Sequence, residues 1–290
     1  MYEVNCLVKV KNELGECPVW SYEDQLLWWI DSSIPTLFRY NPQTQSTDQW
    51  SMPKPIGSFA LRSNGGLIFA FRKGLATMTS PTSPIEWLSW PSTAHPDTRF
   101  NDGKCDSLGR FWVGTMDRNL KDSIGAIFRV DKNLESMKID DGFKISNGIA
   151  WSPDNKTMYF SDSPARTIYA YDFDLAAGIV TNRRIFSVFD DSPGNPDGCA
   201  VDSEGFVWSA RVRAARVDRY DPDGNIERSI QLPVSRPTSL AFGGANMSTL
   251  FITTSTLSLT TEDLHKEPLA GSLFSVETGI KGLKQNSFSG

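Results

Sequence analysis

Polar side chains recur at one position of a sequence repeat. The repeat is aligned on six anchors, which are Trp20, Leu61, Cys105, Trp151, Val201 and Phe242. Four residues before the anchors, in the same order, are Glu16, Gly57, Asn101, Asn147, Asp197 and Thr238. Two carboxylates and two amides therefore share one register. Oxygen donors of this kind hold a hard cation or cap strand ends through Asx-type turns.

A convergence of these four polar residues favours a divalent metal ion. Two carboxylates and two amides in a narrow space repel one another or stay unsatisfied unless a cation or water resolves them. With no His or Cys in the register, the set suits Ca²⁺, Mg²⁺, Mn²⁺ or Fe²⁺ and leaves Zn²⁺ possible. One Asn-Gly or Asp-Gly pair would indicate only a turn, but four polar residues in one register favour a site.

The rest of the sequence limits the classes of catalysis that the protein could perform. The only histidines, His95 and His265, lie in loop-like stretches, which gives acid–base or nucleophilic catalysis by histidine little support. No G-x-S-x-G elbow, Walker loop or G-x-G-x-x-G loop is present. Metal-assisted hydrolysis is the most natural enzyme class, because a cation can polarise a carbonyl and lower the pKa of water.

The repeat itself predicts the architecture. Its anchors are 41 to 50 residues apart, and each copy carries turn residues between apolar runs. About four strands per repeat indicate an all-β, six-bladed β-propeller, in which the register would line the central channel. Residues 2–10 would pair beside the strands of the last blade. A β-sandwich, or two stacked β domains, is the alternative, but it needs no such period.

Composition is consistent with one globular domain, 1–290, because no linker or charge block interrupts the repeats. The net charge of −5 argues against a nucleic-acid partner. Residues 211–216, RVRAAR, are interpreted as an exposed strand edge or loop rather than an anion contact. No stretch has the length of a membrane span or the character of a secretory leader, so we expect a cytoplasmic protein with no membrane partner. No oligomeric state is predicted.

The four cysteines are interpreted as core thiols. Cys6, Cys17, Cys105 and Cys199 are widely spaced and form no C-x-x-C pair, which argues against a disulfide framework or zinc cage. Three of them lie one to four residues after register positions, where a small apolar side chain would pack between blades.

Long ordered blocks resemble a known family. They are LGECPVW, RFNDGKCDSLGRFWVGTMD, ISNGIAWSPDNKTMYFSDS, NPDGCAVDSEGFVWSA and RPTSLAFGG. Over nearly the whole chain they resemble the senescence-marker protein (regucalcin), gluconolactonase and luciferin-regenerating enzyme family, and its bacterial sugar lactonases in particular. The resemblance implies a six-bladed propeller, one divalent metal ion in the channel, and a small-molecule sugar lactone as substrate.

The resemblance also implies residue roles. The family's metal ligands fall on Glu16, Asn147 and Asp197, three of the four register positions. Its substrate contacts fall on Arg99 and Asn101. A glutamate that contacts substrate in the animal members is replaced here by Asn119, and Asp117 precedes it by two residues. This departure leaves the identity of the lactone open, and the rim loops 32–36, 117–124 and 190–197 would shape the pocket.

The hypothesis for the reaction is hydrolysis of a sugar-acid (aldono) lactone to the aldonic acid. The metal ion would polarise the carbonyl and activate water, and Asp197 would take the proton of that water. Asp102 and Lys144 would support the ligands, while Gly57 and Thr238 leave room for the lactone. The alternatives are a non-catalytic calcium-binding or scaffold propeller, and an esterase or phosphotriesterase on the same metal.

Overall fold

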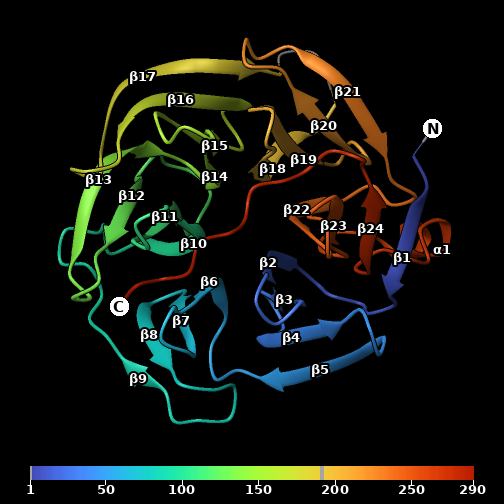
Figure 1. The fold of residues 1–290 in the computed structure, drawn as a ribbon, viewed down its shortest axis with the longest axis horizontal. Coiled ribbons are helices and arrows are strands. Elements are labelled where there is room, and N and C mark those ends of the chain that lie inside the picture. Colours follow the sequence, from blue (N-terminus) through green and yellow to red (C-terminus); the bar gives the residue numbers. More distant parts are fainter. Residues whose placement is uncertain (1, 190–192) are drawn as a thin grey trace. The chain divides into compact units, whose positions relative to one another are not determined.

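The computed structural model describes residues 2–189 and 193–290. Within these residues the regular structure consists of 24 strands and one short helix, α1 (Thr261–Lys266). The strands form six four-stranded antiparallel sheets (Figure 1), which are the blades of the predicted six-bladed β-propeller. The chain divides into two compact units, one formed by Met1–Met52 and Phe189–Lys284, the other by Pro53–Val188 and Gln285–Gly290.

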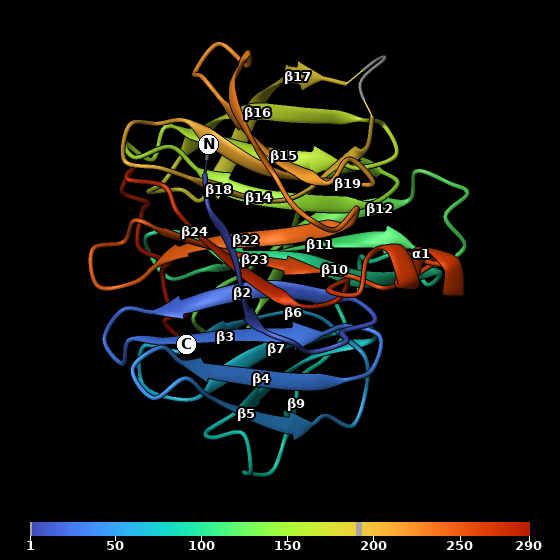
Figure 2. The same cartoon turned by 90° about the vertical axis from the view of Figure 1, so that its right-hand side faces the viewer.

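The first unit contains three blades. One blade consists of β2 (Gly15–Ser21), β3 (Leu26–Asp31), β4 (Thr36–Asn41) and β5 (Ser46–Ser51). Figure 2 shows its four strands stacked in chain order. A second consists of β18 (Asn195–Val201), β19 (Val207–Val212), β20 (Arg216–Tyr220) and β21 (Ile226–Gln231). The third consists of β22 (Pro237–Gly243), β23 (Thr249–Thr254), β24 (Leu273–Glu277) and β1 (Val4–Val8).

The second unit contains the other three blades. The first consists of β6 (Ile56–Leu61), β7 (Leu67–Phe71), β8 (Gly74–Met78) and β9 (Glu86–Trp87). The next consists of β10 (Thr98–Cys105), β11 (Phe111–Asp117), β12 (Gly125–Val130) and β13 (Ser136–Phe143). The last consists of β14 (Ser146–Trp151), β15 (Thr157–Asp162), β16 (Thr167–Asp174) and β17 (Ile179–Val188).

Burial explains the strand order within the blades. The first three strands of a blade are packed on both faces and are mostly apolar, whereas the outer strands β5, β17 and β21 carry exposed polar residues. Large aromatic side chains fill the space between sheets, and Trp29, Trp112 and Trp208 are fully buried. A strand that is covered on both faces has a nearly continuous apolar sequence. The hydrophobic runs of the repeat are therefore the inner strands of the blades.

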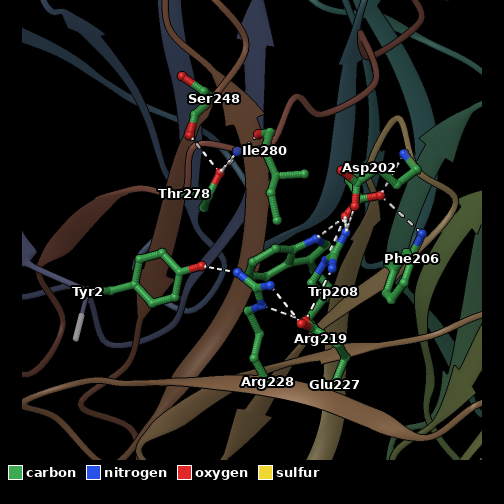
Figure 3. Close-up of polar contacts among 11 residues, drawn as sticks. Tyr2, Asp202, Phe206, Trp208, Arg219, Glu227, Arg228, Ser248, Thr278 and Ile280 are labelled. Carbon is green, nitrogen blue, oxygen red and sulfur yellow. Dashed lines mark hydrogen bonds and ion pairs between the residues drawn. The ribbon is translucent and has the colours of Figure 1, made fainter.

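The N-terminal strand completes the blade of β22, β23 and β24, as predicted. β1 pairs antiparallel with β24, with Val4 opposite Val276. Beyond β1, the hydroxyl of Tyr2 accepts a 2.5 Å hydrogen bond from Arg228. Figure 3 shows this contact continuing through Glu227 to Arg219, whose Nε donates to Asp202 over 2.9 Å. Hydrogen bonds therefore connect the start of the chain to the β18–β21 blade.

The interpretation of residues 211–216 as an exposed edge or loop is wrong for Arg211. Its side chain is fully buried and forms an ion pair of 2.8 Å with Asp218. The same guanidinium lies 3.9 Å from the ring centroid of Phe189 and donates to the carbonyl of Pro193 over 2.7 Å. A buried guanidinium needs a carboxylate and further acceptors, and these are supplied by residues that the sequence does not place near it. Arg213, by contrast, is exposed in a turn.

The cysteine prediction is confirmed. All four thiols are free, and Cys17, Cys105 and Cys199 are buried while Cys6 is partly buried. The prediction of one domain over 1–290 stays a prediction, because contacts divide the chain into the two units above.

Candidate active site

A β-bulge marks the register position in every blade. The first strand of each blade changes its pairing register once near its start, at Glu16/Val19, Ile56/Ser58, Phe100/Gly103, Asn147/Ala150, Pro196/Cys199 and Pro237/Ser239. The six aligned residues lie at these irregularities. A bulge redirects a side chain and bends the strand, and bulges are common beside active sites. The polar register of the sequence is therefore a structural position and not only an alignment.

In the second unit, the substrate and metal candidates form one hydrogen-bonded chain. Nη1 of Arg99 donates to Oδ1 of Asn101 over 3.1 Å, and Nδ2 of Asn101 donates to Oδ1 of Asn147 over 2.8 Å. Nδ2 of Asn147 in turn donates to Oγ of Ser163 over 2.8 Å. Asn147 is buried, and this chain fixes the orientation of its amide. An amide oxygen has two lone pairs, so Oδ1 of Asn147 can also bind a cation.

Asp102 joins the strands that carry Asn101 and Asn147. Its Oδ1 accepts from the backbone N–H of Gly103 over 2.8 Å, and its Oδ2 accepts from that of Gly148 over 2.9 Å. Burial raises the pKa of this carboxyl, while Lys104 and the backbone N–H groups oppose the rise. Asp102 thus has the supporting position that the sequence suggested. Lys144 contributes a backbone contact, because its N–H donates to Oδ2 of Asp162 over 3.1 Å.

Two aspartates that the sequence analysis missed hold the backbone just before two of the candidate ligands. Asp162, at the end of β15, accepts from the backbone N–H groups of Lys144 and Ile145, just before Asn147. Asp31, at the end of β3, accepts from those of Glu13 and Leu14, just before Glu16. The signal was an Asp-Ser pair at the end of the second strand in two repeats. Each carboxylate fixes the backbone from which a ligand candidate projects.

Asp117 has a structural role in the rim loop. Its Oδ1 accepts from the N–H of Asn119 over 2.9 Å, and its Oδ2 accepts from Lys121 and Asp122 over 2.7 and 2.8 Å. Backbone hydrogen bonds from Asp122 and Asn119 hold the pKa of Asp117 below its usual range. Asn119 is exposed in the same loop. Contact of Asp117 or Asn119 with substrate stays a prediction.

The first unit holds the two carboxylate candidates. Glu16 is partly exposed, and its Oε2 accepts from the N–H of Cys17 over 3.3 Å. Cys17 has φ of 50°, a left-handed conformation that a non-glycine residue rarely adopts. Asp197 is 8% exposed within the bulge of β18. Of the predicted rim loop 190–197, residues 190–192 lie outside the described part of the chain.

Thr238 supports Glu16 from the neighbouring blade of the same unit. Its hydroxyl donates to the carbonyl of Gly15 over 2.5 Å and lies 2.9 Å from the hydroxyl of Thr253. Thr238 is buried and takes part in blade packing, so it does not simply leave room for the lactone.

Replacing Thr238 with Val is expected to lower the free energy of unfolding by about 1–2 kcal/mol, because the buried carbonyl of Gly15 loses its donor. Urea unfolding followed by circular dichroism measures the change. Thr181→Val, at an exposed position of β17, is the matched control and should change stability by less than about 0.5 kcal/mol. Equal losses in the two variants would contradict a special role for the Thr238 hydroxyl.

Gly57 does not provide open space. A Cβ atom at this position would lie 2.8 Å from the carbonyl oxygens of Phe100 and Asn101. The expectation that Gly57 leaves room for the lactone is therefore wrong, because the missing side chain allows the backbone of β10 to approach β6. This close approach packs the strand of Asn101 against its neighbour.

Comparison with known proteins identifies the family. Residues 14–256 match the family model described as SMP-30/Gluconolactonase/LRE-like region. The chain belongs to this family. It is 37% identical over 287 residues to a 6-deoxy-6-sulfogluconolactonase of Pseudomonas putida, covering 99% of each chain.

Solved structures of SMP-30/gluconolactonase/LRE-like proteins share the fold. A luciferin-regenerating enzyme superposes with a TM-score of 0.92 at 27% identity and 100% coverage of both chains. A calcium-binding protein, regucalcin, from Agrobacterium tumefaciens superposes with a TM-score of 0.93 at 26% identity, covering 99% of this chain and 97% of that one. The predicted fold class and family are confirmed, and the prediction of a lactonase is confirmed at the level of the family.

The residue types of the predicted donor set suit a hard divalent cation. Among the described residues, no three His, Cys, Asp or Glu side chains form a group that could hold a metal ion. The predicted set contains only two carboxylates, Glu16 and Asp197, and takes its third oxygen from the amide of Asn147. All three are oxygen donors on redirected backbone, which suits a hard cation.

Within the described residues, no helix has the length and apolar character required to cross a membrane. The single helix, α1, has six residues and buries none of them. The predicted cytoplasmic location stays a prediction.

Proposed function

We propose that the protein hydrolyses a sugar-acid lactone to the aldonic acid with the help of a divalent metal ion. The observation that carries this proposal is the chain Arg99–Asn101–Asn147 at two adjacent bulges of a lactonase-family propeller. An arginine and two amides are suited to the carbonyl, ring oxygen and hydroxyl groups of a lactone. The Pseudomonas putida relative is a 6-deoxy-6-sulfogluconolactonase, which supports the same class of reaction.

Glu16, Asn147 and Asp197 are the proposed ligands of the metal ion. Asp162 and Asp31 fix the backbone before two of them, and the Asn101 amide orients the oxygen of Asn147. When bound, the cation supplies positive charge that polarises the lactone carbonyl and lowers the pKa of water. Ca²⁺ is favoured by the similarity to the calcium-binding regucalcin of Agrobacterium tumefaciens, and Mg²⁺, Mn²⁺, Fe²⁺ and Zn²⁺ are the other candidates.

The proposed roles of the remaining residues follow from their chemistry. Arg99 and Asn101 orient the lactone through its oxygens. Asp197 takes a proton from the water that attacks the carbonyl carbon, and returns it to the ring oxygen when the ester bond breaks. Asp117 shapes the loop in which Asn119 meets the substrate. The product gains a carboxyl group and a hydroxyl, which balances the addition of one water, and ionisation of the carboxyl group releases one proton to solvent.

Proton release from a panel of aldonolactones and a simple aryl ester, measured with and without a chelator, tests the proposal. Chelation is expected to lower lactone turnover at least about 10-fold, and one or more divalent ions should restore it. Calorimetry gives a second readout, because a bound ion raises the melting temperature of the native state. Glu16→Gln should lose most of this rise.

Two results would contradict the proposal. Melting that responds to metal without any lactone turnover would favour a calcium-binding or scaffold propeller. Turnover of the aryl ester with none of the lactones would favour an esterase on the same metal.

A further inference from the structure

Two arginines of the first unit lie close to β18, the strand that carries Asp197. Arg213 is in the turn between β19 and β20, and β19 pairs with β18 so that Val212 is opposite Asn195, two residues before Asp197. Arg236 directly precedes β22, and its carbonyl accepts from Ser255 over 3.0 Å. The two segments touch, because the N–H of Ala215 donates to the carbonyl of Ser235 over 3.2 Å.

These arginines lack acceptors among the residues that the structure describes. Nε of Arg236 is buried and donates no hydrogen bond there. Neither Arg213 nor Arg236 forms an ion pair with a described residue, whereas Arg211 and Arg216 of the same blade both pair with Asp218. The nearby Glu267 has its Oε2 occupied by the N–H and hydroxyl of Ser235, at 2.7 and 2.9 Å.

The two guanidinium groups also act on each other. Burial and the charge of Arg213 lower the pKa of Arg236, and the carboxylates of Asp197 and Glu267 oppose that shift. Like charges that face one another across a partly buried space are unfavourable, and so is a buried donor without an acceptor. An anion that bridges the two arginines removes both penalties. Guanidinium groups bind sulfonate, phosphate and carboxylate oxygens through paired N–H donors.

We propose that Arg213 and Arg236 form a subsite for an anionic substituent of the lactone, of the sulfonate, phosphate or carboxylate class. This inference rests on the proposed function and names the substrate class for the same site. The subsite lies next to Asp197, so it would hold the charged end of a substrate whose ester carbonyl is presented to that carboxylate. Neutral aldonolactones would then be opened less efficiently than their anionic analogues.

The test compares kcat/KM for a neutral 1,5-lactone with that for analogues bearing a phosphate, a sulfonate or a carboxylate at carbon 6. Wild type is expected to prefer at least one anionic analogue. Arg213→Gln and Arg236→Gln should each lower the ratio of anionic to neutral kcat/KM by about 10- to 100-fold, mainly through KM. The matched control is Arg184→Gln, which removes an exposed arginine of β17 that pairs with Asp172. It should leave the ratio unchanged.

Inhibition of neutral-lactone turnover gives a readout that does not need an anionic substrate. An aldonate with a phosphate or sulfonate at carbon 6 should inhibit wild type more strongly than the unsubstituted aldonate, and Arg236→Gln should abolish the difference.

The outcomes separate this inference from the proposed function. Turnover of neutral lactones without preference for an anion, or equal losses on neutral and anionic lactones in both arginine variants, would overturn the anionic subsite alone. Equal losses would mean that the arginines contact the reacting group common to all lactones. Absence of turnover on every lactone would overturn both proposals.

Discussion

Asp197→Asn is expected to lower kcat for lactone hydrolysis by about 10²–10⁴-fold, the range that a positioned general base contributes. Asp197 lies in the bulge of β18 and is 8% exposed. Asparagine has almost the same volume, so the packing around the side chain should be kept. An amide cannot accept the proton of the attacking water, and it binds a cation more weakly than a carboxylate does. Steady-state proton release with the preferred lactone measures the change.

The control for Asp197→Asn is Asp223→Asn, at an exposed turn of the same blade. It makes the same chemical change away from the bulge and should keep wild-type turnover. Both variants should show the wild-type circular dichroism spectrum, because neither replaces a large side chain. If Asp197→Asn retained more than about a tenth of wild-type turnover, Asp197 would not be the base.

The repeat made much of the fold predictable from sequence. Its turns and apolar runs recur every 41 to 50 residues. Turn residues and strand periodicity are local features, so the sequence alone indicates them. The aligned polar residues Glu16, Asn101, Asn147 and Asp197 lie at the register shift of their strands, which the sequence did not predict. The addition of β1 to β24 also followed from an apolar segment left over before the first repeat.

Tertiary contacts of single side chains were not predictable in the same way. Gly57 looked like an open position because its lack of a side chain is visible in the sequence, while the β10 backbone that fills the space is not. Arg211 looked exposed because its partners Asp218 and Pro193 become neighbours only in the folded blade. Asp162 and Asp31 act on backbone N–H groups 17 or 18 residues away. Such partners depend on tertiary packing, which overrides local pattern.

Asp102 shows how this packing reaches the site. Its carboxylate accepts hydrogen bonds from the backbone N–H groups of Gly103 and Gly148, at 2.8 and 2.9 Å. These groups flank Asn101 in one blade and Asn147 in the next. Since Nδ2 of Asn101 donates to Oδ1 of Asn147 over 2.8 Å, the spacing of the two blades sets the geometry of both amides.

Asp102→Ala is therefore expected to lower both stability and activity. Two buried N–H groups lose their acceptor, and at about 1–3 kcal/mol each the free energy of unfolding should fall by about 2–6 kcal/mol. Asp102→Asn keeps one acceptor oxygen, so its free energy of unfolding should lie between those of wild type and Asp102→Ala. Urea unfolding gives the free energies, and lactone turnover well below the unfolding transition gives the effect on the site.

The matched control is Asp141→Ala, which removes an exposed carboxylate of β13 paired with Lys138. It should change stability by less than about 1 kcal/mol, as for other surface ion pairs. A loss below about 1 kcal/mol for Asp102→Ala would contradict its role as the link between the blades. A large loss of stability with unchanged kcat and KM would show that the amide pair is held by other contacts, because Asp102 would then support the fold and not the site.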